Sequence, residues 1–121
     1  MKSILFFSTI CFLGFFQPSV ATAQTTADAQ LGMTTKFKVY GNCGMCEKRI
    51  EKAAKKVKGV TSAEWSDKTQ ILTVSFNEQK VTPSKIQAAV AAVGHDTETV
   101  RAKDAVYAKL PECCQYERAP K

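Results

Sequence analysis

Residues 36–60 have the sequence KFKVYGNCGMCEKRIEKAAKKVKGV, and this stretch decides the fold that we expect. Its first five residues alternate between apolar and polar side chains, with Phe37 and Val39 on one face, which predicts a strand over 36–40. Residues 41–44 form a turn-rich break. Residues 47–58 then place apolar side chains at positions i, i+3, i+4 and i+7, which predicts an amphipathic helix followed by a terminating glycine.

The rest of the chain continues this alternation of strands and helices. Residues 60–66 and 70–76 alternate in hydrophobicity on either side of a tight turn, which predicts a hairpin. Residues 82–94 begin with Thr-Pro, an N-cap followed by a proline, and end with glycine, which predicts a second helix. A shorter strand is expected at 96–102. The order βαββαβ predicts an α+β fold, a ferredoxin-like sandwich with a four-stranded antiparallel sheet and two helices on one face.

The two ends of the chain lie outside this unit. Residues 1–23 combine a positive start, an apolar run too short to span a bilayer and a small-residue A-x-A sequence, the pattern of a secretory signal peptide. We therefore expect an exported protein, in the periplasm, whose mature part does not span a membrane. The expected divisions are the signal peptide at 1–23, a flexible leader at 24–33, the folded domain at 34–102, and a Cys-Cys tail with a short helix at 103–121.

The sequence Cys43-Gly44-Met45-Cys46 is the candidate functional site, because it places two thiols between a strand and a helix. The N-terminus of a helix offers free N–H groups and partial positive charge, and both favour the thiolate form that binds metal ions. Thiolates select soft ions, and two ligands suit the low coordination number of Cu(I) or Hg(II), whereas Zn(II) prefers four. We therefore expect Cys43 and Cys46 to bind Cu(I) first, Hg(II) second, and Zn(II) only with added ligands.

Three further residues are candidates for the same site. His95, the one histidine of the sequence, precedes the last expected strand, and this topology should bring it near the cysteines. It is a third ligand, a pH-sensitive neighbour of the ligands, or a surface residue in a turn. Cys113 and Cys114 either form disulfides, add thiolates to the metal site, or form a separate metal site. We favour a metal role for them, because a soft-metal protein gains from extra thiolates.

From residue 34 to about 102 the chain resembles the heavy-metal-associated domain. This family includes small copper chaperones, the metal-binding domains of copper-exporting ATPases and a periplasmic mercury-binding protein. The resemblance rests on residues 41–46, on the helix that ends in Lys58-Gly59-Val60, and on residues 92–95. It implies a ferredoxin-like fold and Cys43 and Cys46 as metal ligands. The family motif is G-M-x-C-x-x-C, and this chain departs from it by carrying Gly41 at the position of the methionine.

Two other functions compete with a metal chaperone or scavenger. Cys-Gly-Met-Cys is similar to the active-site sequence of thioredoxin, so a thiol–disulfide oxidoreductase that uses Cys43 and Cys46 is the alternative. An inert domain with structural disulfides is the third. We expect no enzyme, because the sequence offers no Ser/His/Asp set, phosphate-binding loop or paired carboxylates. The formal net charge of +6 favours acidic partners, such as a metal-transporting membrane protein or another metal-binding domain, and we expect no nucleic acid.

Overall fold

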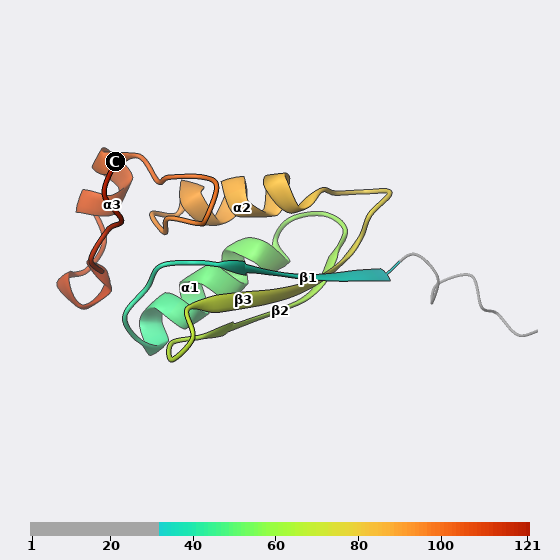
Figure 1. Cartoon of the computed structure of the whole chain (residues 1–121), viewed down its shortest axis with the longest axis horizontal. Helices are drawn as coiled ribbons and strands as arrows, with labels where there is room; N and C mark the ends of the chain where they lie inside the picture. Colours follow the sequence, from blue (N-terminus) through green and yellow to red (C-terminus); the bar gives the residue numbers. More distant parts are fainter. Residues whose placement is uncertain (1–31) are drawn as a thin grey trace, which may run out of the picture.

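A three-stranded antiparallel sheet forms one layer of the computed structural model, which describes residues 32–121 (Figure 1). The strands are β1 (Gly32–Lys38), β2 (Val60–Ser66) and β3 (Ile71–Asn77), with β3 in the centre. Phe37 and Trp65 both lie opposite Leu72, so alternate side chains of all three strands share one face. That face is buried, as the alternation in the sequence predicted.

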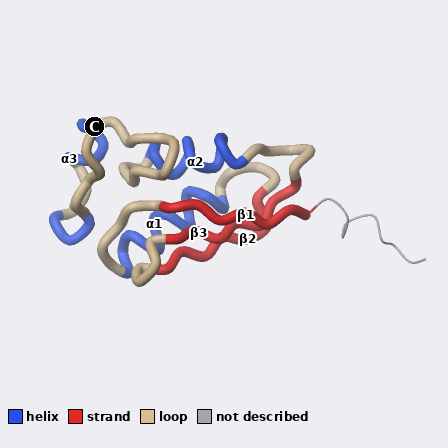
Figure 2. The backbone as a smooth tube through the Cα atoms, in the orientation of Figure 1, coloured by secondary structure: helices blue, strands red, loops and turns tan. Residues whose placement is uncertain are grey.

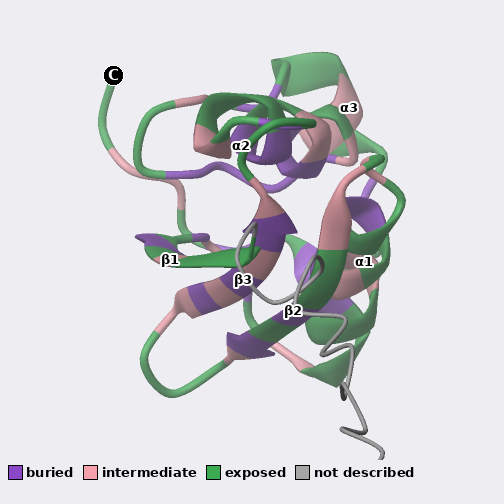
Figure 3. Cartoon of the chain, turned by 90° about the vertical axis from the view of Figure 1, so that its right-hand side faces the viewer, coloured by how far each residue is buried: buried purple, intermediate pink, exposed green. Residues whose placement is uncertain are grey.

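Two helices, α1 (Gly44–Lys55) and α2 (Pro83–Ala92), supply the second layer of the core. Figure 3 shows buried residues, in purple, on both helices and on the strands of the sheet. Gly59 and Gly94 follow the two helices with φ values of 103° and 105°, a left-handed conformation that glycine adopts without a Cβ clash. The buried helical residues are Cys46, Ile50, Ala53 and Ala54 in α1, and Ile86, Gln87, Val90 and Ala91 in α2.

The ferredoxin-like α+β fold is confirmed, with one difference at the edge of the sheet. Residues 96–102 form no continuous strand, and Figure 2 shows the chain between α2 and α3 as loop. A single antiparallel bridge joins Val39 to Thr97 instead. The Thr97 hydroxyl donates to the Val100 carbonyl at 3.1 Å and accepts from the Val100 N–H at 3.0 Å. These side-chain bonds close a turn that directs the chain away from the sheet, so only one pair of residues can bridge.

Several element boundaries also differ from those expected. Helix α1 begins at Gly44 rather than at residue 47, so Cys46 lies in its first turn. Strand β1 begins at Gly32, two residues inside the expected leader. The expected signal peptide and the remainder of the leader lie outside the described residues. Among residues 32–121, no helix has both the length and the apolar character needed to cross a bilayer.

The C-terminal segment forms the expected short helical tail. It contains α3 (Asp104–Ala108) and a single 3₁₀ turn, η1 (Glu112–Cys114). Three of its side chains are buried and belong to the same core cluster as the sheet and helices: Leu110, Cys114 and Tyr116. The tail is therefore packed against the domain.

Candidate metal centre

Cys43 and Cys46 converge at the start of α1, as their spacing predicted. Cys43 is the N-cap residue, with extended backbone angles, and Cys46 is in the first helical turn. Side chains in a helix point back toward its N-terminus, so the Cys46 sulfur is directed toward the preceding residue of the pair. The two Sγ atoms lie 3.6 Å apart.

The two thiols have different surroundings and different proton affinities. Cys43 is half-buried, whereas Cys46 is fully buried. Hydrogen bonding from the Cys46 backbone N–H to the Cys43 sulfur lowers the pKa of Cys43 to about 7. Burial raises the pKa of Cys46 to about 11. Near neutral pH the pair therefore combines a partly ionised sulfur at the surface with a protonated sulfur behind it.

The loop before the cysteines is shaped by close packing at Gly41. A Cβ atom at this position would lie 2.9 Å from the Trp65 ring and 3.1 Å from the Cβ of Cys46. The Gly41 N–H donates to the side-chain oxygen of Gln70 at 2.9 Å, and the Trp65 indole N–H donates to the Val39 carbonyl at 3.0 Å. Trp65 thus supports the loop where the family motif carries methionine, and it excludes any larger residue at position 41. No pattern in the sequence indicated this contact.

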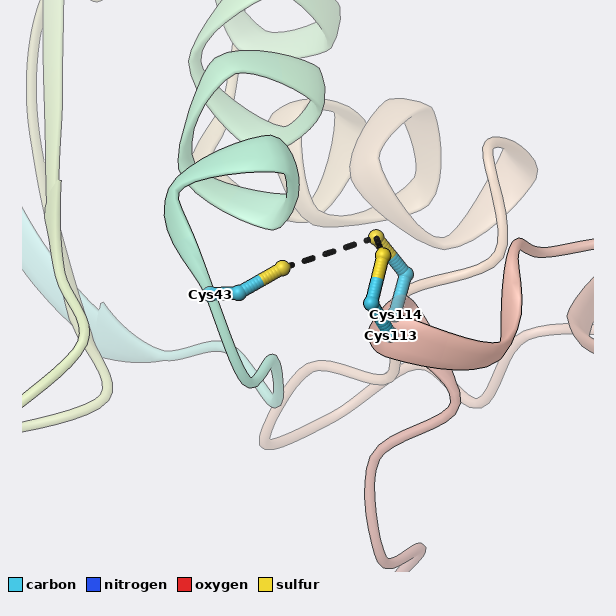
Figure 4. Close-up of side chains that lie close together, drawn as sticks. All are labelled: Cys43, Cys113 and Cys114. Carbon is cyan, nitrogen blue, oxygen red and sulfur yellow. Dashed lines mark hydrogen bonds between the residues drawn. The ribbon is translucent and has the colours of Figure 1, made fainter.

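The tail brings two further sulfurs to the same place (Figure 4). Cys114 is fully buried, and its Sγ lies 3.8 Å from that of Cys43. Cys113 is exposed, and its Sγ lies 3.9 Å from Cys114 Sγ and 3.6 Å from the Met45 sulfur. Within the described residues, the ligand atoms of Cys43, Cys113 and Cys114 all lie within 4.8 Å of one another. All four cysteines of this part of the chain are free thiols.

His95 lies close to the loop but does not join this cluster of sulfurs. It is fully buried, so it is not a surface residue, and its ring stacks on Tyr116 at 5.4 Å between centroids. Its Nδ1 is 2.8 Å from the Tyr40 carbonyl, which can only accept, so Nδ1 carries the hydrogen. Burial lowers the pKa of His95, which favours the neutral ring. Its Nε2 is buried and has no hydrogen-bond partner among the described residues.

The side chains that anchor the tail had no clear signal in the sequence. The Tyr116 hydroxyl donates to the Gly94 carbonyl at 2.8 Å and accepts from the Asp96 N–H at 2.7 Å. The guanidinium of Arg118 donates to both carboxylate oxygens of Asp96, at 2.8 and 2.7 Å. This pairing, together with the backbone N–H of Ala102, keeps the pKa of Asp96 below its usual value despite its burial. The tail is therefore held by a tyrosine and an ion pair, both distant in sequence from their partners.

Fold and site together define a class: an α+β domain with a pair of thiols at the start of its first helix. The profile of the heavy-metal-associated domain family matches residues 39–96. Over these residues the chain is similar to the heavy-metal-associated domain, as the resemblance in the sequence had indicated. The tail from residue 103 onward lies outside this match.

Individual relatives support the same assignment. A curated relative, the mercuric transport protein periplasmic component of Shewanella putrefaciens, is 37% identical over 54 residues, 45% of this chain. The match spans 59% of that relative's length. The CopZ metallochaperone superimposes with a TM-score of 0.52 at 29% identity, covering 54% of this chain and 98% of that one. Oxidized MerP from Ralstonia metallidurans CH34 superimposes with a TM-score of 0.53 at 28% identity, covering 55% of this chain and 94% of that one.

Proposed function

We propose that this protein binds a soft metal ion, Cu(I) above all, through the thiolates of Cys43 and Cys46, and serves as a chaperone or scavenger without catalysis. The observation that carries the proposal is the 3.6 Å separation of the two sulfurs at the start of α1. Two thiolates that bond one ion at about 2.3 Å lie at most about 4.6 Å apart, so a small rotation of Cys43 suffices for binding. Hg(II) is the second candidate, and Zn(II) requires more ligands than this pair provides.

The different environments of the two thiols suit capture and release of an ion. Cys43 is partly exposed and has a pKa of about 7, so it can offer a thiolate to an incoming ion at neutral pH. Cys46 is buried and loses its proton only when the metal takes its place, because metal binding releases protons from its ligands. The exposed sulfur also gives a partner protein access to the ion.

The test is an anaerobic titration of the reduced, full-length protein with Cu(I) against a competing chelator. We expect the wild type to bind one ion per chain. The double variant Cys43→Ser/Cys46→Ser should bind Cu(I) at least roughly a hundredfold more weakly, because both thiolates are lost. Thermal unfolding of the double variant controls for a folding defect. Undiminished binding by a folded double variant would refute the proposal.

We further propose that the protein works outside the cytoplasm, in the periplasm. The signal-like pattern of residues 1–23 supports this location, and the curated relative is named as a periplasmic component. Export would remove residues 1–23 and leave Gln24 at the N-terminus. The mass of the protein recovered from a periplasmic extract of a bacterial host tests this directly, and an uncleaved chain there would contradict it.

The partner that fits the surface is an acidic face of a metal-transporting membrane protein or of another metal-binding domain. A groove along α1, next to the thiols, is lined by basic side chains with an apolar floor. Opposite charges across such a contact speed association and align the partners. Charge reversal by Lys52→Glu should slow copper transfer to an acidic acceptor domain, measured by stopped flow, and leave equilibrium copper binding unchanged. The basic residues of the groove are Lys48, Arg49, Lys52 and Lys56.

A thiol–disulfide oxidoreductase is the second candidate, and one observation favours it. An accessible Cys43 with a pKa of about 7 beside a buried Cys46 with a pKa of about 11 resembles an attacking and a resolving thiol. Reduction of insulin disulfides by the protein, without stoichiometric Cu(I) binding, would establish this function instead. Binding without such activity would exclude it.

A further inference from the structure

The tail supplies a buried thiol to the site, although it lies outside the part of the chain that matches the metal-binding family. Cys114 has no exposed surface, and its sulfur lies 3.8 Å from that of Cys43. Figure 4 shows Cys43 pointing from the start of α1 toward the turn η1 that carries Cys114. Cys43 is therefore the common neighbour of two buried thiols, Cys46 at 3.6 Å and Cys114 at 3.8 Å.

The position of Cys114 is fixed from both sides along the chain. On its N-terminal side, Leu110 is buried and packs against Gly94, where a Cβ atom would lie only 3.0 Å from the leucine side chain. On its C-terminal side, the buried Tyr116 bonds to the backbone of Gly94 and Asp96. A thiol between two such anchors has little freedom, so its approach to Cys43 is a property of the packed core.

We propose that Cys114 is a third thiolate ligand, which makes the soft-metal site a three-sulfur site with Cys43 and Cys46. The inference rests on the proposed metal-binding function and specifies its coordination. Three sulfurs arranged in a plane at about 2.3 Å from one ion lie about 4.0 Å apart, whereas a linear pair lies about 4.6 Å apart. The distances of 3.6 and 3.8 Å at Cys43 are closer to the planar arrangement.

Cys113 serves a different purpose and provides the matched control. It lies next to Cys114 in sequence and within 4.8 Å of the Cys43 sulfur, but it is exposed, and its thiol donates to the Met45 sulfur at 3.6 Å. Met45 is itself 52% exposed. Cys113 therefore differs from the buried thiols in its exposure and in its contact with Met45, not in its distance from Cys43.

A third thiolate changes how the ion is held without any redox step. Each ligand gives its proton to the solvent as the metal–sulfur bond forms, so a fully protonated site releases three protons per ion. The ion keeps its oxidation state. Three bonds have to be exchanged before the ion leaves, so the tail slows release to a competing chelator.

The experiment is X-ray absorption spectroscopy on the reduced, full-length protein loaded anaerobically with one equivalent of Cu(I). We expect three sulfur neighbours in the wild type and in Cys113→Ser, and two in Cys114→Ser. In chelator competition, Cys114→Ser should bind Cu(I) at least roughly tenfold more weakly, which is the loss expected when only a residue supporting a metal ligand is removed. The affinity of Cys113→Ser should stay near that of the wild type.

The outcomes separate this inference from the proposed function. Two sulfurs in copper-loaded wild type would overturn the third ligand and leave the Cys43–Cys46 site intact. Loss of a sulfur in Cys113→Ser, or three sulfurs retained in Cys114→Ser, would equally overturn the assignment to Cys114. Undiminished copper binding after loss of both Cys43 and Cys46 would refute the proposed function itself. If Cys114→Ser fails to fold, the sulfur counts in the wild type and in Cys113→Ser together still decide the question.

Discussion

The loop that carries Cys43 and Cys46 and the tail that carries Cys114 bring their thiols to one place by different means. In the loop, a strand, a turn and a helix that follow one another in sequence set the spacing of the sulfurs. In the tail, Cys114 reaches Cys43 across 71 positions of sequence, through side-chain contacts with the segment at Gly94–Asp96. The loop is thus local in sequence and lies within the family match, whereas the tail lies outside that match and depends on tertiary contacts.

Replacing Tyr116 by alanine should have the largest effect, because the tail depends on this side chain. Tyr116 is 2% exposed and stacks against His95, with Tyr107 at its edge. We expect Tyr116→Ala to lower the free energy of unfolding by about 3–5 kcal/mol, the cost of removing a buried aromatic ring. Denaturant unfolding of the reduced protein measures this loss.

Tyr116→Phe separates the ring from its hydroxyl. It should cost about 1–3 kcal/mol, because the Gly94 carbonyl and the Asp96 N–H each lose a buried partner. Wild-type stability in Tyr116→Ala would mean that the tail is only an appendage, and the comparison between tail and loop would fail.

Asp96→Asn should have the next largest effect, because it removes the charge that pairs with Arg118. Breaking such a buried pair costs about 3 kcal/mol, and the carboxylate of Asp96 is 4% exposed. The pKa of Asp96 is lowered in the folded protein, so its contribution is present above the unfolded pKa and is lost as the pH falls through the folded value. The stability difference between wild type and variant should therefore be complete at pH 7 and shrink in strong acid.

Asp104→Asn is the matched control for that ion pair. Asp104 contacts the same Arg118 at 2.7 Å, but its side chain is 70% exposed, so solvent screens the interaction. We expect little change in unfolding. An equal loss of stability in both variants would show that burial does not distinguish the two carboxylates.

Gly41→Ala tests the loop rather than the tail. The added Cβ would approach Trp65 to 2.9 Å, and overpacking of this kind costs about 1–3 kcal/mol. Gly44→Ala is the control, since a Cβ there meets nothing within 4 Å and alanine favours the helix. Thermal unfolding should separate the two variants, with Gly44→Ala at or above wild type. Equal stability would show that Trp65 does not shape the loop.

The smallest effect concerns reactivity and leaves stability unchanged. Cys43, with a pKa of about 7, should react with iodoacetamide at a rate that rises as the pH passes upward through 7, because the thiolate is the nucleophile. Cys46, with a pKa of about 11, should stay unmodified over that range. Peptide mass spectrometry of the metal-free protein distinguishes them, and both should react alike in urea. Equal rates in the folded protein would contradict the difference between the two thiols.

Much of the fold could be predicted from the sequence, because its patterns are local. Alternation predicted β2 and β3 nearly to the residue. The apolar stripe of α1 and the glycine after it predicted a helix there, with both ends three residues away from those observed. The convergence of Cys43 and Cys46 followed from the same local geometry. The fourth strand could not be excluded in this way, since the turn that replaces it depends on a Thr97 hydroxyl bonding to Val100.

By itself, the sequence determined the order of the first five elements (β1, α1, β2, β3 and α2), the face of each that is buried, and the pair of thiols at one helix start. These properties depend on residues a few positions apart, whose relative orientation is set by backbone geometry. Tertiary structure alone decided that Trp65 lies under Gly41, that His95 is buried beside Tyr116, and that Cys114 meets Cys43. Such contacts join distant segments, and their geometry depends on how the whole core packs, which no pattern in a short stretch can specify.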